Sequence, residues 1–345
     1  MKRIIGSATL LLLSIVASCL AAPVAEVAPF AISRRIPVGG DGGWDLLCVD
    51  NASRRLFVTH ATRVVVIDAP TGKLIGEVAG TPGVHGVALA PELGRGFTSN
   101  GRDSSVTVFD LKTLATMATV KLDARNADAI AYDEVSGRVF VFNAGSASAS
   151  VIDAKTNAVA GTVELGGQPE LAVTDGAGRL FVNIEDSSAV VVIDTRTLKV
   201  LARWPLAPGE EPTGLAIDRR HHRLFAACAN EKLVVLDAVR GTRVAVLPIG
   251  KGVDGAAFDA ERGLVFTSNG EGTMSVIRED APDRFRVLET VTTERGARTL
   301  AVDESTGEIY LPTSDFGPPP PPTPDRPKPW PTLVPGTFRV LVVKR

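Results

Sequence analysis

The feature that most constrains this chain is a segment of about 42 residues that recurs along nearly its whole length. The clearest copy, residues 171–213, reads LAVTDGAGRLFVNIEDSSAVVVIDTRTLKVLARWPLAPGEEPT. It contains four short runs that are β-branched or alternate between apolar and polar residues, and clusters of Gly, Asp, Ser and Thr separate them. A four-strand unit that repeats at this period predicts a β-propeller, in which each copy forms one blade.

The number of blades follows from counting the first strands. They are predicted to end at seven positions: Asp50, Pro91, Asp133, Asp175, Asp218, Asp259 and Asp303. The seventh copy shows three strands before Arg345, while one strand-like segment, Phe30–Gly40, precedes the first copy. An N-terminal strand that completes the last blade would close the ring and remove its open sheet edges. We therefore predict an all-β fold, a seven-bladed β-propeller with four antiparallel strands per blade, closed by that strand.

A second regularity lies where the third strand of a copy ends, because five copies place an aspartate there. These residues are Asp68, Asp110, Asp153, Asp194 and Asp237. An Asp carboxylate in a turn accepts hydrogen bonds from backbone N–H groups two or three residues further on. We expect these five side chains to form the hairpin turns to the fourth strands.

The N-terminus has the pattern of a secretory signal peptide, residues 1–22. Lys2 and Arg3 precede an apolar run, Ala8–Ala17, that is too short to span a bilayer. The residues VASC, ending at Cys19, fit a bacterial lipobox, whereas cleavage near Ala21 would give a soluble protein. We expect an exported protein, either periplasmic or a lipoprotein anchored at Cys19, without a transmembrane span and with membrane contact only if lipidated. Residues 23–29 are expected to be a linker and residues 30–345 one propeller domain.

The remaining cysteines, Cys48 and Cys228, fall in the first and fifth copies, which do not adjoin in a ring of seven. A disulfide needs Cα atoms within about 7 Å. We therefore predict two buried thiols and no disulfide. Without a Cys/His cluster in the sequence, zinc and c-type haem are not expected.

The seventh copy carries a proline-rich insertion, residues 317–335, between its second and third strands. Its sequence GPPPPPTPDRPKPWPTLVP favours extended polyproline geometry. We expect a semi-rigid surface loop, which is either a tolerated insertion or a lid or partner-docking loop that uses Trp330.

The second and third strands carry the clearest resemblance to a known family. The segments RLFVTHATRVVVID, RVFVFNAGSASASVID and RLFVNIEDSSAVVVID resemble the YVTN-repeat β-propeller family. The segment GVHGVALAPELGRGFTSNGRDSSVTVFD resembles the YncE-like exported bacterial group. The resemblance covers residues 30–345 and implies a seven-bladed propeller outside the cytoplasm, but it implies little about activity.

Two columns of residues are expected at one mouth of the ring, because strands one and two run antiparallel. The start of strand one contributes Asp45, Gly86, Asp128, Glu170, Thr213, Asp254 and Arg298, with Trp44 and His85 one residue earlier in their blades. The end of strand two contributes His60, Asn100, Asn143, Ile184, Cys228, Asn269 and Thr313, with Glu185 on the same face. The candidate ligand-binding set is Trp44, Asp45, His85, Asn100, Asp128, Asn143, Glu170, Glu185, Asp254, Asn269 and Arg298.

The chemistry of this mouth leaves alternatives open. Its acids either bind a small polar ligand or are simply solvated. If a metal binds, Asp45, Asp128, Glu170 and Asp254 would suit Ca²⁺ or Mg²⁺, and no other cofactor is indicated. His85 is the only catalytic candidate, with a structural histidine as the alternative. His221 and His222 belong to a turn on the opposite face, for which a solvated role is expected.

The favoured function is a non-enzymatic exported propeller that binds a small ligand or an envelope protein at the acidic mouth. The alternative is a propeller-lactonase-like hydrolase that uses His85 with acidic residues or a divalent cation. A nucleic-acid binder is a weaker alternative, because the net charge is −2 and aromatic residues make up only 5% of the chain. The sequence contains neither a Gly-rich phosphate loop nor a GxSxG motif, and three tryptophans are too few for a quinoprotein propeller.

Overall fold

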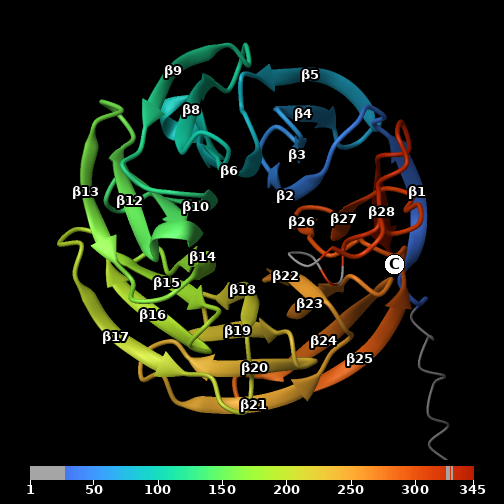
Figure 1. Ribbon diagram of the computed structural model, residues 1–345. Helices are drawn as coiled ribbons and strands as arrows, with labels where there is room; N and C mark the ends of the chain where they lie inside the picture. Colours follow the sequence, from blue (N-terminus) through green and yellow to red (C-terminus); the bar gives the residue numbers. More distant parts are fainter. Residues whose placement is uncertain (1–27, 324–326, 328) are drawn as a thin grey trace, which may run out of the picture.

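The described residues, 28–323, 327 and 329–345 of a computed structural model, form seven four-stranded antiparallel sheets. The sheets are arranged as blades around a common axis, as Figure 1 shows. This confirms the predicted seven-bladed β-propeller. The predicted signal peptide, with Cys19, lies outside the described residues. Among the described residues, the structure contains no helix long and apolar enough to cross a membrane.

Blades one to six each use four consecutive strands, so chain order and sheet order agree. Blades one to three comprise β2 (Trp44–Asp50), β3 (Arg55–His60), β4 (Arg63–Asp68), β5 (Lys73–Ala79), β6 (Val84–Ala90), β7 (Arg95–Asn100), β8 (Ser105–Asp110), β9 (Thr116–Lys121), β10 (Ala127–Asp133), β11 (Arg138–Asn143), β12 (Ser148–Asp153) and β13 (Val159–Glu164). Blades four to six comprise β14 (Pro169–Thr174), β15 (Arg179–Ile184), β16 (Ala189–Asp194), β17 (Val200–Pro205), β18 (Pro212–Asp218), β19 (Arg223–Cys228), β20 (Lys232–Asp237), β21 (Arg243–Pro248), β22 (Val253–Asp259), β23 (Leu264–Asn269), β24 (Thr273–Ala281) and β25 (Arg284–Thr292).

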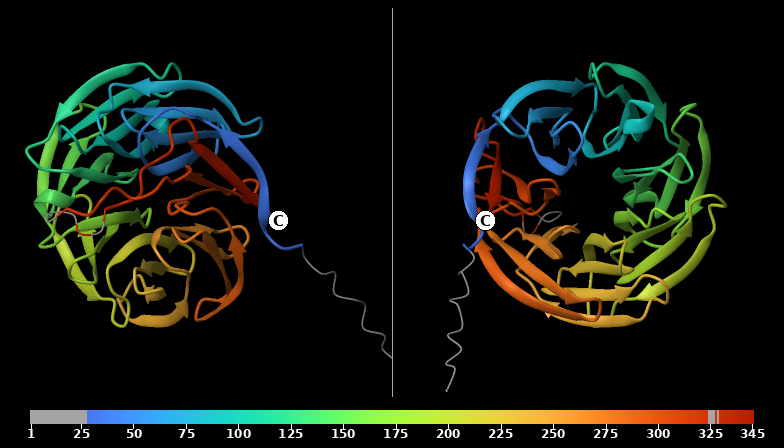
Figure 2. Two further views of the ribbon diagram at one scale, coloured as in Figure 1. Left: turned by 45° about the vertical axis from the view of Figure 1, so that its right-hand side comes forward. Right: turned by 180° about the vertical axis from the view of Figure 1, so that it is seen from behind.

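Blade seven joins the two ends of the chain. Its strands are β26 (Ala301–Asp303), β27 (Glu308–Thr313), β28 (Arg339–Lys344) and, on the outside, β1 (Ala31–Pro37). β1 pairs antiparallel with β28, from Ala31 opposite Lys344 to Pro37 opposite Arg339. In both views of Figure 2, the blue β1 lies along the edge of the red blade. The predicted closure by an N-terminal strand is confirmed.

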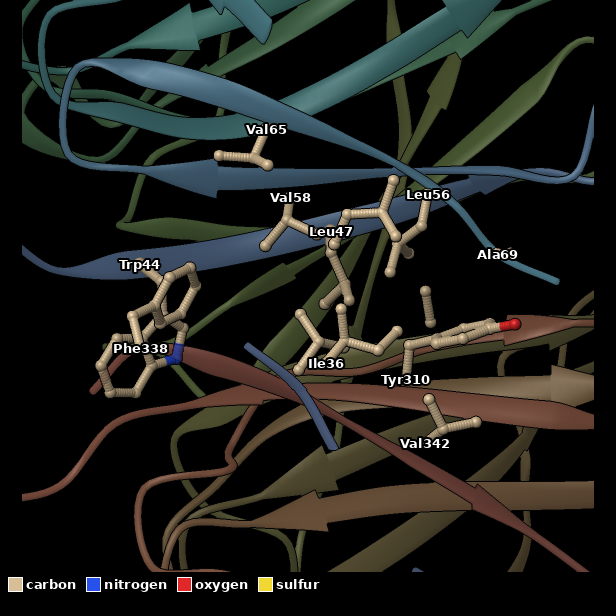
Figure 3. Close-up of a cluster of buried hydrophobic side chains, with 13 residues drawn as sticks. Ile36, Trp44, Leu47, Leu56, Val58, Val65, Ala69, Tyr310, Phe338 and Val342 are labelled. Atoms are coloured by element: carbon tan, nitrogen blue, oxygen red, sulfur yellow. The ribbon is translucent and has the colours of Figure 1, made fainter. Parts of the chain in front are cut away.

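Apolar packing between blades holds the closed ring together. Figure 3 shows the cluster between blades one and seven, where Ile36 of β1 meets Leu56, Tyr310 and Val342. Ile36 is only 2% exposed. Burying a side chain of this size stabilises the fold by roughly 1.5–3 kcal/mol, so the closing strand contributes to the core and not only to the hydrogen-bond ladder.

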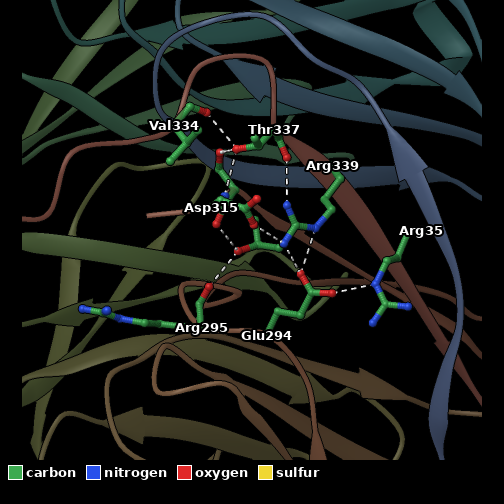
Figure 4. Close-up of polar contacts among 9 residues, drawn as sticks. Arg35, Glu294, Arg295, Asp315, Val334, Thr337 and Arg339 are labelled. Carbon is green, nitrogen blue, oxygen red and sulfur yellow. Dashed lines mark hydrogen bonds and ion pairs between the residues drawn. The ribbon is translucent and has the colours of Figure 1, made fainter. Parts of the chain in front are cut away.

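A polar network reinforces the same closure, as Figure 4 shows. The carboxylate of Glu294 accepts hydrogen bonds from Arg35 Nε at 2.7 Å and from Arg339 Nε at 2.8 Å. Arg339 Nη2 also donates to Asp315 Oδ1 at 2.8 Å. Glu294 follows β25, so the network links blade six to β1, to β28 and, through Asp315, to the segment between β27 and the insertion.

The hairpin aspartates behave as predicted. Asp110 Oδ1 accepts hydrogen bonds from the backbone N–H groups of Lys112 at 3.0 Å and Thr113 at 2.7 Å. Equivalent turn contacts occur at the other four positions, Asp68, Asp153, Asp194 and Asp237. Two first strands end one residue earlier than predicted, at Ala90 and Thr174. At the first of these, Pro91 begins a 3-10 turn and has no N–H to donate to the ladder.

Cys48 and Cys228 are free thiols among the described residues, as predicted. Cys228 is buried and Cys48 is half-buried as a whole residue, while burial raises the pKa of the Cys48 thiol to about 12, so the thiol group itself is shielded as predicted. Cys48 lies on β2, the innermost strand of its sheet, whereas Cys228 ends a second strand whose residues are all shielded except the first.

Candidate functional site at the acidic mouth

A β-bulge recurs at the same place in the first strands of blades one to six. In β2, Trp44 pairs with His60 and Leu47 pairs with Val58, so β2 carries one residue more than its partner over this interval. The residues that follow the first pair in each blade are Asp45, His85, Asp128, Glu170, Thr213 and Asp254. A bulge bends the strand and re-aims side chains. Each of these six side chains therefore lies at the same structural position.

This register corrects the expected column in blade two. The repeat in the sequence predicted that Gly86 occupies the position in blade two that Asp45 and Asp128 occupy in blades one and three, with His85 one residue earlier. In the structure, Val84 pairs with Asn100 and Gly86 with Ser99, so His85 occupies the bulge. The cause is the strand end used for blade two: the prediction took Pro91 as the last residue of the first strand, but β6 ends at Ala90, which moves the equivalent position from Gly86 to His85.

The bulges bring four carboxylates from separate blades into one cavity of about 180 Å³. Asp45, Asp128, Glu170 and Asp254 line it together with Arg298, as the sequence predicted for these five side chains. The apolar part of the wall comes from the residues that follow three of the acids, Leu46, Ala129 and Leu171. A concave site with convergent polar groups is typical of small-ligand binding.

Hydrogen bonds between neighbouring blades fix the backbone at this cavity. The carbonyl of Asp45 accepts a hydrogen bond from Thr299 Oγ1 at 2.8 Å. Ser99 Oγ donates to the carbonyl of Asp128, and Ser268 Oγ donates to the carbonyl of Arg298. Because each donor belongs to an adjacent part of the ring, the positions of the acidic side chains depend on ring closure.

His85 adds an imidazole to the rim of this cavity. Its Nδ1 lies 2.6 Å from Asp45 Oδ2 and 3.6 Å from Asp128 Oδ1. Burial by itself would lower the pKa of His85, but the hydrogen bond to Asp45 and the charge of Asp128 outweigh it and raise the pKa. The imidazole therefore favours its charged form and compensates part of the negative charge.

The carboxylates remain under-compensated. Burial, together with the neighbouring Asp128 and Asp254 charges, raises the pKa of Glu170 to about 8. Burial is also the main cause that raises the pKa of Asp128 to about 6. It raises the pKa of Asp254 to about 6 although Arg298 Nε lies 2.6 Å from Asp254 Oδ2. Protons or a cation must therefore neutralise part of this cluster near neutral pH.

Gln168, a residue that the sequence analysis did not single out, connects Glu185 to Glu170 by hydrogen bonds. Gln168 Nε2 donates to Glu185 Oε2 at 2.6 Å and to Glu170 Oε1 at 3.4 Å. Burial raises the pKa of Glu185, with the charge of Glu211 as the next cause. Gln168 stands before the bulge in blade four only, so no repeated column pointed to it.

The three predicted asparagines do not line the acidic cavity. Asn100, Asn143 and Asn269 are fully buried. In each blade the amide donates to hydroxyl groups of the third strand, as Asn100 Nδ2 does to Ser105 Oγ and Thr107 Oγ1, both at 3.0 Å. The equivalent acceptors are Ser148 and Ser150 for Asn143, and Thr273 and Ser275 for Asn269. These asparagines link strands within a blade, because their side chains point along the sheet and not toward the axis.

Trp44 belongs to a neighbouring apolar cavity of about 380 Å³. The indole stacks on Phe338 at a centroid distance of 5.4 Å, and the cavity wall includes Phe316 and Trp330. The proline-rich insertion supplies Trp330, Pro331 and Leu333, and Leu333 forms a β-bridge with Phe316. Arg298 lines both cavities, which therefore adjoin.

The side chains at the mouth that could bind a divalent cation together are not the four that the sequence predicted. Asp45, His85 and Asp128 each offer a ligand atom, and these atoms lie within 4.8 Å of one another. The predicted set combined Asp45 and Asp128 with Glu170 and Asp254, and these two are not part of the group. One imidazole nitrogen with two carboxylate oxygens is a donor set that Mn²⁺ or Zn²⁺ accepts more readily than Ca²⁺.

No family model and no curated protein matches the chain. Solved structures do match. The "Crystal structure of RRP9 WD40 repeats" has a TM-score of 0.76 at 9% identity, covering 90% of this chain and 97% of that chain. The "Structure of U3-55K" has a TM-score of 0.74 at 9% identity, covering 89% and 97%. A chain of the "Crystal Structure of Mitotic Checkpoint Complex" has a TM-score of 0.71 at 14% identity, covering 86% and 95%. At these identities the likeness establishes the seven-bladed propeller fold.

Proposed function

We propose that this protein is an exported, non-enzymatic binding protein that holds a positively charged small ligand in its acidic cavity. The observation that carries the proposal is the meeting of Asp45, Asp128, Glu170 and Asp254 in one cavity of about 180 Å³. A cavity of this size and charge suits an ammonium group or a divalent cation.

The electrostatics of the cavity give such a ligand a driving force. The pKa of Glu170, about 8, means that this carboxyl is mostly protonated in the empty cavity at neutral pH, whereas Asp128, with a pKa of about 6, takes up its proton in mildly acidic solution. A bound cation favours the ionised carboxylates, so binding releases protons and strengthens as the pH rises.

The adjoining apolar cavity accounts for the remainder of a ligand larger than an ion. Trp44, Phe316 and Trp330 present aromatic surface next to the acidic group, with Arg298 at the boundary. An amine that carries an aromatic or alkyl group would place its charge among the acids and its apolar part under the insertion. A partner protein would use the same surface through a lysine side chain, and the 80% exposed Trp330 is available for such contact.

Binding is tested by isothermal titration and thermal shift with MnCl₂, CaCl₂, MgCl₂ and phenethylamine. We expect at least one probe to bind the wild type and to raise its melting temperature. The variant Asp128→Asn/Glu170→Gln should bind that probe at least about 10-fold more weakly, since about 1.4 kcal/mol corresponds to tenfold.

The matched control is Glu164→Gln/Asp283→Asn, which removes the same two charges from exposed positions on blades three and six. It should bind the probe as the wild type does. The proposal fails if none of the four probes binds the wild type, or if the cavity variant keeps wild-type affinity.

A hydrolase is the second candidate, and the 2.6 Å contact between His85 Nδ1 and Asp45 Oδ2 favours it. A carboxylate that holds an imidazole in this way orients it as a general base, and a divalent cation at the same group would activate water. Turnover of simple lactones by purified protein, lost in His85→Gln, would replace the binding proposal with this one.

Export is proposed from residues 1–22 alone. The mass of the N-terminal peptide from protein expressed in a bacterium separates the two routes. A lipid-modified Cys19 identifies a lipoprotein, an unmodified terminus near Pro23 identifies a soluble exported protein, and a retained residue 1 contradicts export.

A further inference from the structure

A second group of metal-binding side chains lies at the opposite end of the ring, between blades five and six. Asp218 ends β18, His221 lies in the turn to β19, and Glu279 lies near the end of β24. His221 Nδ1 is 2.7 Å from Asp218 Oδ2 and 3.1 Å from Glu279 Oε1. All three ligand atoms lie within 4.8 Å of one another. The prediction of a solvated turn is therefore wrong for His221, which contacts two buried carboxylates.

Both carboxylates are enclosed. The side chains of Asp218 and Glu279 are each 3% exposed, whereas that of His221 is 35% exposed. Within the described part of the chain, Glu279 Oε2 and Asp218 Oδ2 have no hydrogen-bond donor, and Asp218 Oδ2 has only its ion-pair contact with His221. The two carboxylates interact with each other, and burial followed by the charge of Asp218 raises the pKa of Glu279 to about 7. Two enclosed carboxylates in contact need either a shared proton or a bound cation.

The surrounding arginines do not supply that cation. Arg220 contributes only its backbone N–H, which donates to Asp218 Oδ1 at 2.8 Å. Arg223 pairs with Asp237 at 3.4 Å, and Arg219 pairs with Glu134 at 3.0 Å. Arg278 Nη1 donates to the carbonyl of Arg262 at 3.3 Å. Among the described residues, His221 is the one cationic side chain within 4 Å of either buried carboxylate.

We propose that Asp218, His221 and Glu279 form a binding site for a divalent transition-metal ion of the Zn²⁺ type. One imidazole nitrogen and two carboxylate oxygens are ligands that Zn²⁺ accepts, and the partly exposed His221 leaves a side open to solvent for a fourth ligand. Because Asp218 and His221 belong to blade five and Glu279 to blade six, the ion would join two neighbouring blades. The site is independent of the acidic mouth.

The test uses the full chain in a His85→Gln background, so that the group formed by Asp45, His85 and Asp128 does not contribute. Metal is first removed with a chelator, and ZnCl₂ is then titrated by calorimetry and by thermal shift. We expect one zinc ion per chain and a rise in melting temperature of about 3 °C at saturating zinc.

Two ligand variants and one neighbouring control decide the result. His221→Gln and Glu279→Gln should each weaken zinc binding at least about 10-fold, as loss of a ligand does. His222→Asn should bind as the background does, because His222 is adjacent but is not part of the group. Asn also tolerates the positive φ of 54° at this position.

Circular dichroism melts without metal show whether each variant is folded. Replacing Glu279 removes one of two buried charges, so a folded variant is expected. If the background binds no zinc at micromolar concentration, or if both ligand variants bind it unchanged, the proposal is overturned. That result would assign the pair of carboxylates to a shared proton.

Discussion

The variant Glu170→Gln should change how the stability of this protein depends on pH. The pKa of Glu170 is raised from its ordinary 4.5 to about 8, chiefly by burial. The folded state therefore holds this proton more tightly than the unfolded state does, and the wild type loses stability as the pH rises from 4.5 through 8. At about 1.4 kcal/mol per tenfold, the full loss is on the order of 4–5 kcal/mol. We expect about half of that, because the cavity is open to solvent, which screens the charge.

The assay is thermal melting from pH 5 to pH 8.5, compared with the exposed control Glu164→Gln. The glutamine that replaces Glu170 cannot ionise, so the melting temperature of this variant relative to wild type should increase with pH, by several degrees over the range. Other titrating groups are present in both proteins and largely cancel in the difference. If the difference in melting temperature between Glu170→Gln and the wild type stays constant from pH 5 to pH 8.5, the raised pKa of Glu170 and the electrostatic account of the cavity are both refuted.

Two further predictions concern the scaffold. Deleting residues 30–40 removes β1 and Ile36 and exposes the edge of β28, so we expect loss of soluble monomer and a melting temperature lower by on the order of 10 °C; a truncated protein that melts like the parent would contradict closure by this strand. Asn100→Ala removes the donor to two buried hydroxyl groups and should cost about 1–3 kcal/mol of stability in chemical denaturation, with unchanged cation binding. If Asn100→Ala instead weakens cation binding and leaves stability unchanged, Asn100 contributes to ligand binding and not to the stability of its blade.

The fold could be predicted from the sequence because its signals are local and repeated. Alternation of apolar and polar residues marks each strand, and turn residues such as Asp153 form contacts within three residues in the chain. The closing strand at Phe30–Gly40 follows from counting the strands in each copy, because the seventh copy lacks one. The four acids also follow from the repeat, because equivalent positions in similar blades face the same axis. Asp45 and Asp254 lie in the first and sixth blades, far apart in the chain, yet they meet in one cavity.

Only the tertiary structure decided which side chains join them. Because β6 ends at Ala90 and not at Pro91, His85 occupies the position that the sequence gave to Gly86. The asparagines at the ends of the second strands turn into the sheets, where hydroxyl groups of the third strands accept hydrogen bonds from their amide nitrogens. His221 and Glu279 meet only because adjacent blades pack side by side. Repetition in the sequence sets where each strand lies, but bulges and contacts between blades set where each side chain points.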